Sequence, residues 1–167
     1  KLIELGNKYI NEELKDLNVG RKVKVLPEQI HFLPKDIFNR RREKDSPRAI
    51  FFSLRRGVLV DRDFFTRKGL GLYKATFHEM IHMASFLRFR KFSIHQERLD
   101  VDTTRIGYAG YYGERGKEYD LFQLINEMTV DKLVVEIFNK HSTELIKKLK
   151  ITKQEEEKGI GYYPYHF

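Results

Sequence analysis

The sequence predicts an α+β fold, with long helices and a small mixed β-sheet. Apolar residues recur at helical spacing over residues 2–17, 70–86 and 120–139. Between these stretches, short runs of β-branched and aromatic residues end at charges, prolines and glycines, as strands do. The 167 residues are 41% hydrophobic, which is enough to build the core of one domain. We therefore expect a single domain over residues 1–167.

The N-terminal part, residues 1–45, should contain the first helix and short strands. Two β candidates follow the helix at residues 23–26 and 29–33, and a polar loop leads from them to Pro47. The apolar positions of the helix are Leu2, Leu5, Tyr9, Ile10, Leu14 and Leu17.

The central part, residues 46–140, should form the catalytic core. It should begin with a hairpin over residues 49–54 and 57–61, followed by the second helix over 70–86. A strand–turn–strand segment over 101–113 and the third helix over 120–139 should come next. The C-terminal part, residues 141–167, should hold a basic amphipathic helix over 143–151 and an aromatic tail over 159–167.

The composition limits the chemistry available to the chain. It has no cysteine, so it forms no disulfide and offers no thiolate to a metal. No apolar run approaches the 18 residues typical of a membrane-spanning helix. The first residue is Lys1 rather than Met, as we expect for an excised domain or a processed product.

The chain is basic, with a formal net charge of +8. This charge suggests an acidic partner such as a nucleic acid, an anionic surface or an acidic polypeptide. Two basic clusters stand out, at residues 40–44 and 88–91, and the second directly follows the second helix. No helix-turn-helix, RNA-binding or zinc-finger pattern accompanies them, so charge alone is the basis for a nucleic-acid partner.

The second helix carries an HExxH motif, His78-Glu79-Met80-Ile81-His82. Histidines four residues apart lie one turn apart on the same helix face, so both imidazoles can reach one metal ion. Zinc held by such ligands keeps a coordination position open for water. Glu79 could take a proton from that water. Two polar side chains on a face of an apolar helix are costly unless something binds them, which favours a metal site.

The third ligand determines the class of zinc site. A metzincin continues the motif as HExxHxxGxxH, but this chain has Ser85 and Arg88 where the glycine and histidine would stand. In the third helix, Glu127 and Asp131 are four apart and share a face. Glu127 could therefore bind the metal while Asp131 hydrogen-bonds a ligand histidine. The competing third ligands are His95, Asp100 and Asp102.

The two motifs together resemble those of the gluzincins, zinc metallopeptidases in which HExxH is followed by a helix with an Asn-Glu-x-x-x-Asp pattern. Asn126, Glu127, Thr129 and Asp131 match that pattern, and the resemblance covers residues 58–140. Small bacterial gluzincins are similar in the short hairpin between the motifs. The gap between the motifs is longer here than in compact thermolysin-like members.

This resemblance implies a zincin-like fold with thermolysin-like active-site helices, and one Zn²⁺ per chain. It also implies that one strand of the hairpin over residues 49–61 lies above the helix that carries HExxH, where that strand could pair with the substrate backbone. The implied roles are zinc ligands for His78, His82 and Glu127, general base and acid for Glu79, and orientation of a histidine for Asp131.

In hydrolysis by such an enzyme, a tyrosine, histidine or arginine should stabilise the oxyanion of the tetrahedral intermediate. The eligible residues are Tyr108, Tyr111, Tyr112, Tyr119 and His166. His166 belongs to the aromatic tail, which could also pack on the core or occupy the cleft.

Together, these features predict a zinc-dependent endopeptidase with a polypeptide substrate. The alternatives are an inactive metallopeptidase-like domain that binds a partner segment, a nucleic-acid-associated protease recruited by the basic clusters, and a hydrolase of non-peptide amides. The intact HExxH argues against the inactive domain, because a binding scaffold has no need of Glu79 as a base.

Overall fold

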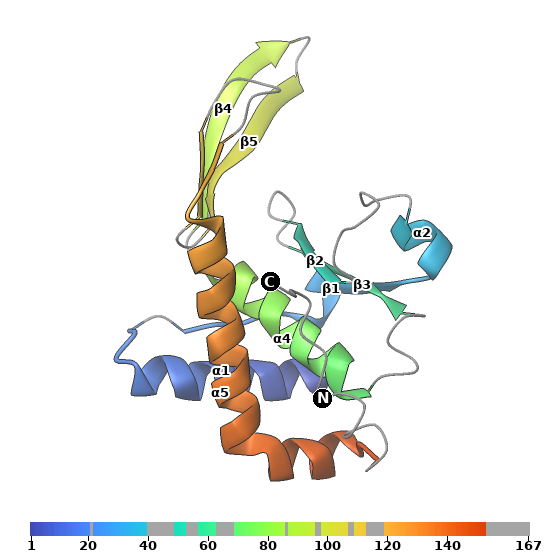
Figure 1. Cartoon of the computed structure of the whole chain (residues 1–167). Coiled ribbons are helices and arrows are strands. Elements are labelled where there is room, and N and C mark those ends of the chain that lie inside the picture. The colour runs from blue at the N-terminus through green and yellow to red at the C-terminus, as the bar shows by residue number, and fades with distance from the viewer. Residues whose placement is uncertain are drawn as a thin grey trace.

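The computed structural model describes residues 1–20, 22–39, 49–52, 57–62, 69–85, 87–95, 98–106, 109–112 and 119–152. Within them, helix α4 (Gly69–Ala84) occupies the centre. Helices α1 (Leu2–Asp16) and α5 (Gln123–Leu149) pack against α4, and the strands of a small sheet also contact it. Figure 1 shows α5 crossing in front of α1, with the sheet beside α4.

The small sheet is mixed, as predicted. Its order is β1-β3-β2, with β1 (Ile30–Leu33) parallel to β3 (Gly57–Asp61) and β2 (Ala49–Phe52) antiparallel to β3. The predicted hairpin is therefore confirmed as β2 and β3. The central strand β3 is buried on both faces, which explains its continuous apolar run. A 3₁₀ turn (Pro27–Gln29) precedes β1, and a short helix, α2 (Lys35–Asn39), follows it.

The prediction of a strand over residues 23–26 is wrong. These residues form no ladder, because two asparagines of α1 bind their backbone instead. The side-chain amide of Asn11 donates to the carbonyl of Val23 and accepts from its N–H, at 2.7 and 2.6 Å. Asn7 binds Val25 in the same two ways, each at 2.8 Å. Both valines remain buried, so the alternating apolar pattern reflects an extended segment held along a helix.

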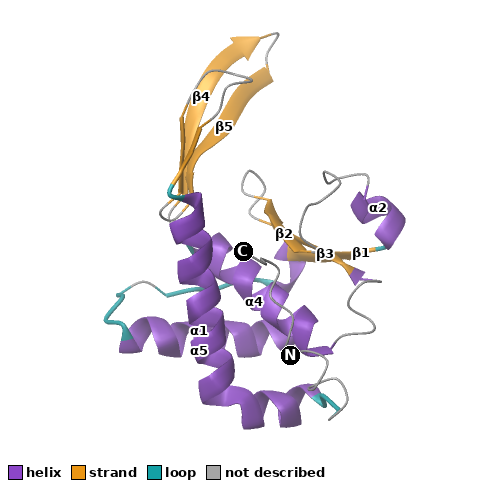
Figure 2. Ribbon diagram, viewed as in Figure 1, coloured by secondary structure: helices purple, strands orange, loops and turns teal. Residues whose placement is uncertain are grey.

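A second sheet is antiparallel, with the order β4-β5-β6-β7. The strand–turn–strand prediction is confirmed by the pairing of β5 (Arg98–Ile106) with β6 (Ala109–Tyr112). Strand β4 (Leu87–His95) was not predicted, because the charges of residues 88–91 concealed the alternation of Leu87 and Phe89. Strand β7 (Tyr119–Leu121) was not predicted either, and two of its three residues were assigned to the third helix. Figure 2 shows β4 and β5 projecting away from the helices as an arm.

Residues 120–139 and 143–151 were predicted to form separate helices, and this is wrong. A single helix, α5, covers residues 123–149. Contacts with α1 support α5 at residues 139–143, the polar stretch between the two predicted helices. The ring of His141 stacks on that of Tyr9 with 4.1 Å between centroids, and Lys140 forms ion pairs with Asp16 and Glu13. At the other end, Phe122 adopts a left-handed conformation (φ 59°) between β7 and α5.

The core lies where α1, α4, α5 and the small sheet meet. Among the described helices, none combines the length and the apolar character needed to cross a membrane. The largest fully buried apolar side chains are Tyr9, Phe38, Phe77, Ile10, Met80, Ile137, Leu145, Val58 and Val60.

Candidate metal centre

Helix α4 holds its two motif histidines in the interior of the protein. Phe77 and Met80 are fully buried and anchor the helix in the core. His78 and His82, one turn apart, are only 3% and 6% exposed. Imidazoles at that depth need polar partners, since burial without them is costly. The partners come from α5.

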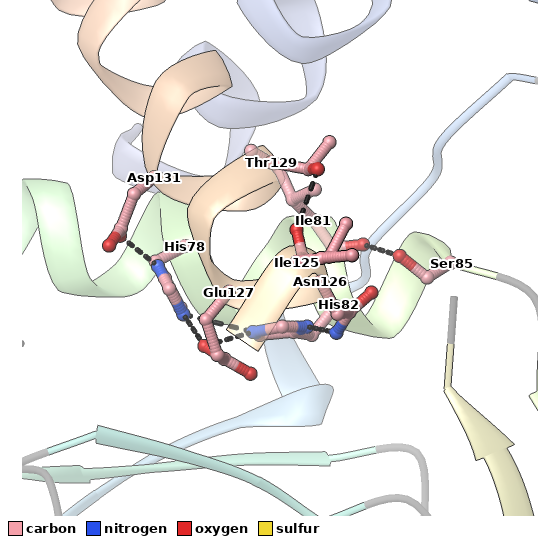
Figure 3. A network of polar contacts seen from close by, with 9 residues as sticks. All are labelled: His78, Ile81, His82, Ser85, Ile125, Asn126, Glu127, Thr129 and Asp131. Atoms are coloured by element: carbon pink, nitrogen blue, oxygen red, sulfur yellow. Dashed lines mark hydrogen bonds and ion pairs between the residues drawn. The ribbon is translucent and has the colours of Figure 1, made fainter. Parts of the chain in front are cut away.

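Glu127 of α5 meets both histidines. One carboxylate oxygen, Oε2, lies 3.0 Å from Nε2 of His78 and 3.2 Å from Nε2 of His82. The two Nε2 atoms are 2.9 Å apart. Figure 3 shows the three side chains pointing toward one another from the two helices. Among the described residues, His78, His82 and Glu127 form the group that could hold a metal ion.

The spacing of these three atoms suits a small metal ion. A tetrahedral zinc ion with bonds of about 2.0–2.2 Å holds neighbouring ligand atoms roughly 3.3 Å apart, close to the three distances here. Two imidazoles and one carboxylate also match the donor set of a catalytic zinc site, which has three protein ligands. The residues therefore fit zinc in donor type and in spacing.

Asp131 is the hydrogen-bond partner of the Nδ1 atom of His78. Its Oδ1 lies 2.8 Å from Nδ1 of His78, one turn along α5 from Glu127. A carboxylate at Nδ1 can accept the proton there, which would leave the lone pair of Nε2 directed at the point where the three ligand atoms meet. The predicted pairing of Asp131 with a motif histidine is present.

Asn126 faces the other motif histidine, His82, and sequence reasoning assigned it no role. Its side chain is 3% exposed, and its amide nitrogen is 3.4 Å from Nδ1 of His82. A side-chain amide can turn either its NH₂ group or its oxygen toward the ring. With the oxygen turned inward, Nδ1–H of His82 donates and Nε2 is free to bind a metal. The signal was present in the sequence, because Asn126 belongs to the motif that contains Glu127.

Glu79 lies in the same buried region but points to the small sheet. Burial raises the pKa of its carboxyl group, although His78 and His82 oppose that shift. The backbone N–H of Phe51 in β2 donates a hydrogen bond to Glu79. The described structure thus connects the motif glutamate with an outer strand of the sheet.

The charges within the cluster depend on one another. Burial alone would lower the pKa of His78, but hydrogen bonds to Asp131 and Glu127 raise it to about 10. Burial alone would raise the pKa of Glu127, but its hydrogen bonds to His78 and His82 hold it far below the usual range. The two carboxylates thus favour positive charge between the helices, and a metal cation satisfies the same preference as a proton.

Several other predicted residues remain outside this description. Tyr108, His166, the first basic cluster and the aromatic tail lie outside the described residues. Tyr111, Tyr112 and Tyr119 are placed by their backbone on β6 and β7, and their side chains are outside the description. The same holds for the second basic cluster on β4, and for the competing ligands His95, Asp100 and Asp102 on β4 and β5.

The backbone bears on one competing ligand. His95 ends β4, at the end of the strand away from α4, and a nine-residue strand spans roughly 30 Å. Glu127, by contrast, reaches both motif histidines directly.

Comparison of the chain with protein-family models, with curated proteins and with solved structures gave no match.

Proposed function

We propose that this protein is a zinc-dependent hydrolase of the gluzincin type that cleaves peptide bonds. The observation that carries the proposal is the convergence of His78, His82 and Glu127 on one point from two helices. Asp131 and Asn126 support it, because each faces the Nδ1 atom of a different histidine. This is the outer support that metal-binding histidines generally have.

A bound zinc ion supplies Lewis-acid chemistry, by which it acidifies a water molecule and polarises a carbonyl oxygen. Glu79 is the proton carrier of this proposal. A raised pKa suits a group that takes a proton from the attacking water and passes it to the leaving nitrogen. The hydrogen bond from Phe51 limits where its carboxylate can lie.

The position of β2 supports a polypeptide as substrate. Strand β2 is an outer strand of the described sheet and packs against α4. An extended chain can pair with such an edge through main-chain hydrogen bonds. Phe51 of β2 contacts Glu79, so a substrate held on this edge would lie beside the proposed base.

An assay with unfolded casein tests the proposal. We expect the zinc-loaded protein to cleave casein, to lose activity with a chelator and to regain it when zinc is restored. Glu79→Gln should retain zinc and lose activity by about 10²–10⁴-fold, the usual contribution of a general acid–base. Glu28→Gln, an exposed change of the same kind, is the control.

An unchanged rate in Glu79→Gln would remove Glu79 from the mechanism. A protein that binds zinc but cleaves no peptide would favour the inactive binding domain or the hydrolase of other amides.

A further inference from the structure

A cavity of about 340 Å³ lies between α1, α4 and α5. The three candidate metal ligands and Glu79 are not among its described lining residues. The cavity is therefore separate from the proposed catalytic centre. The two share one neighbour, Asn126, which lines the cavity and contacts His82. The volume falls within the range of small-molecule sites, roughly 300–1,000 Å³.

The walls of the cavity are mainly apolar side chains of the three helices. Helix α1 contributes Ile10 and Leu14, α4 contributes Ile81, and α5 contributes Leu133. On α5 the lining residues run from 126 to 137, which is about three turns, or roughly 16 Å at the rise of an α-helix. A space of that length suits a chain better than a compact ring.

The polar residues at the cavity have partners within the protein. The hydroxyls of Ser85 and Thr129 each donate to the backbone carbonyl four residues earlier. Glu13 pairs with Lys140 at 3.5 Å, and its Oε2 is buried. The amide of Asn126 faces a motif histidine. A charged or strongly polar ligand would lose its hydration here and gain little in return, so the walls favour a hydrocarbon.

The exposed part of the described wall lies at the C-terminal end of α1. Leu17 and Val19 line the cavity there and are 53% and 43% exposed. A Schellman turn holds this rim, with Asn18 between them in a left-handed conformation (φ 58°). The N–H of Val19 donates to the carbonyl of Leu14 at 2.8 Å, and that of Asn18 to the carbonyl of Lys15 at 2.9 Å. Because Leu14 also lines the cavity, the turn fixes the rim and one wall together.

We propose that this cavity binds the alkyl chain of a small uncharged amphiphile. The chain lies along α5 between the three helices, and its polar end stays in water at the rim formed by Leu17 and Val19. The affinity comes from apolar surface that leaves water, on the ligand and on these two exposed side chains. The site is additional to the proposed hydrolase centre.

NMR titration of the full chain with two probes of equal length tests the site. Octanol carries one hydroxyl, and octanediol carries one at each end, so the diol must bury a hydroxyl to fill the cavity. We expect octanol to saturate one site per chain. The diol should bind about tenfold more weakly, since burial of a hydroxyl without its full set of partners is costly.

The methyl signals locate the bound probe. Octanol should shift the methyl signals of Ile10, Ile81 and Leu133, which line the cavity. The methyl signals of Val58 and Val60 should not move, because these residues are buried in the small sheet.

Two exposed leucines test the rim. Leu17→Ser should weaken octanol at least about threefold, because it removes apolar surface that the chain covers. Leu26→Ser is the matched control, because Leu26 is 39% exposed and is not among the described lining residues. It should leave the affinity unchanged. Ala84→Leu, which narrows the cavity, should also weaken octanol.

The proposal is overturned if octanol does not saturate, if the shifted methyl groups lie away from the cavity, or if Leu17→Ser and Leu26→Ser bind octanol equally. Equal affinities for octanol and octanediol would overturn it too. Contacts of the cavity methyl groups with the aromatic tail, in the free protein, would assign the cavity to the chain's own C-terminal residues instead. Because the titration needs neither metal nor substrate, its result is independent of the proposed hydrolase activity.

Discussion

At the scale of single residues, each histidine of the candidate metal group has its own neighbour on α5 at the Nδ1 atom of its ring. Asp131 lies 2.8 Å from His78, and the amide of Asn126 is 3.4 Å from His82. Motif spacing together with the family resemblance predicted the convergence of His78, His82 and Glu127. It could not predict the contact of Phe51 with Glu79, because that depends on how β2 packs against α4.

We predict that Asp131→Asn lowers zinc affinity about 10–100-fold, the usual effect of losing an outer partner of a metal ligand. A competition titration against a chelator of known affinity measures this. Glu136→Gln, farther along α5, is the control, because its carboxylate pairs with Lys132 and not with the cluster. Equal affinities in the two variants would show that Asp131 does not orient His78.

At the scale of elements, α1 acts as a support for an extended segment. Asn7 and Asn11 take up backbone groups of Val25 and Val23 that a strand partner would otherwise bind. Residues 23–26 were predicted to be a strand, and they are extended, but a helix rather than another strand binds their backbone. The pattern of apolar residues indicates which side chains are buried. It does not indicate whether a strand or a helix supplies the hydrogen-bond partners of the backbone.

We predict that Asn11→Ala lowers the free energy of unfolding by about 1–3 kcal/mol, because it leaves the backbone N–H and C=O of Val23 without their partner. Chemical denaturation measures the change. Asn139→Ala, an exposed substitution on α5, should be near neutral. A loss in Asn139→Ala as large as in Asn11→Ala would contradict the supporting role.

The contact between α1 and α5 should also respond to acid. Hydrogen bonds from Lys148 and from Lys8 hold the pKa of Glu144 at about 2, below its ordinary value of 4.5. A carboxyl group whose pKa is lowered in the folded protein stabilises the fold fully at pH values above its ordinary pKa. That stabilisation is lost as the pH falls toward 2, the pKa in the folded protein.

We therefore expect Glu144→Gln to melt at a lower temperature than the wild type at pH 7, and the difference to shrink between pH 4.5 and 2. The difference should be small, because the ion pairs are exposed. Thermal melts over this pH range measure it, and a difference that stays constant down to pH 2 would contradict the assignment.

At the scale of the whole molecule, the proposed site depends on bringing together two helices that are far apart in sequence. The second sheet lies between them in the sequence, and its strands β4 and β5 extend away from the helices (Figure 1). Helices α1 and α4 and the strands of the mixed sheet followed from periodicity, whereas α5 was wrongly predicted as two helices. Strand β4 of the arm did not follow from periodicity, because its charged residues concealed the alternation of its apolar side chains.

The central claim is that His78, His82 and Glu127 hold one zinc ion, and elemental analysis of purified, zinc-reconstituted protein tests it most directly. We predict about one zinc per chain in the wild type and in His95→Ala, and its loss in Glu127→Ala, since a catalytic zinc site needs three protein ligands. No zinc in the wild type, or zinc lost in His95→Ala and kept in Glu127→Ala, would contradict the claim.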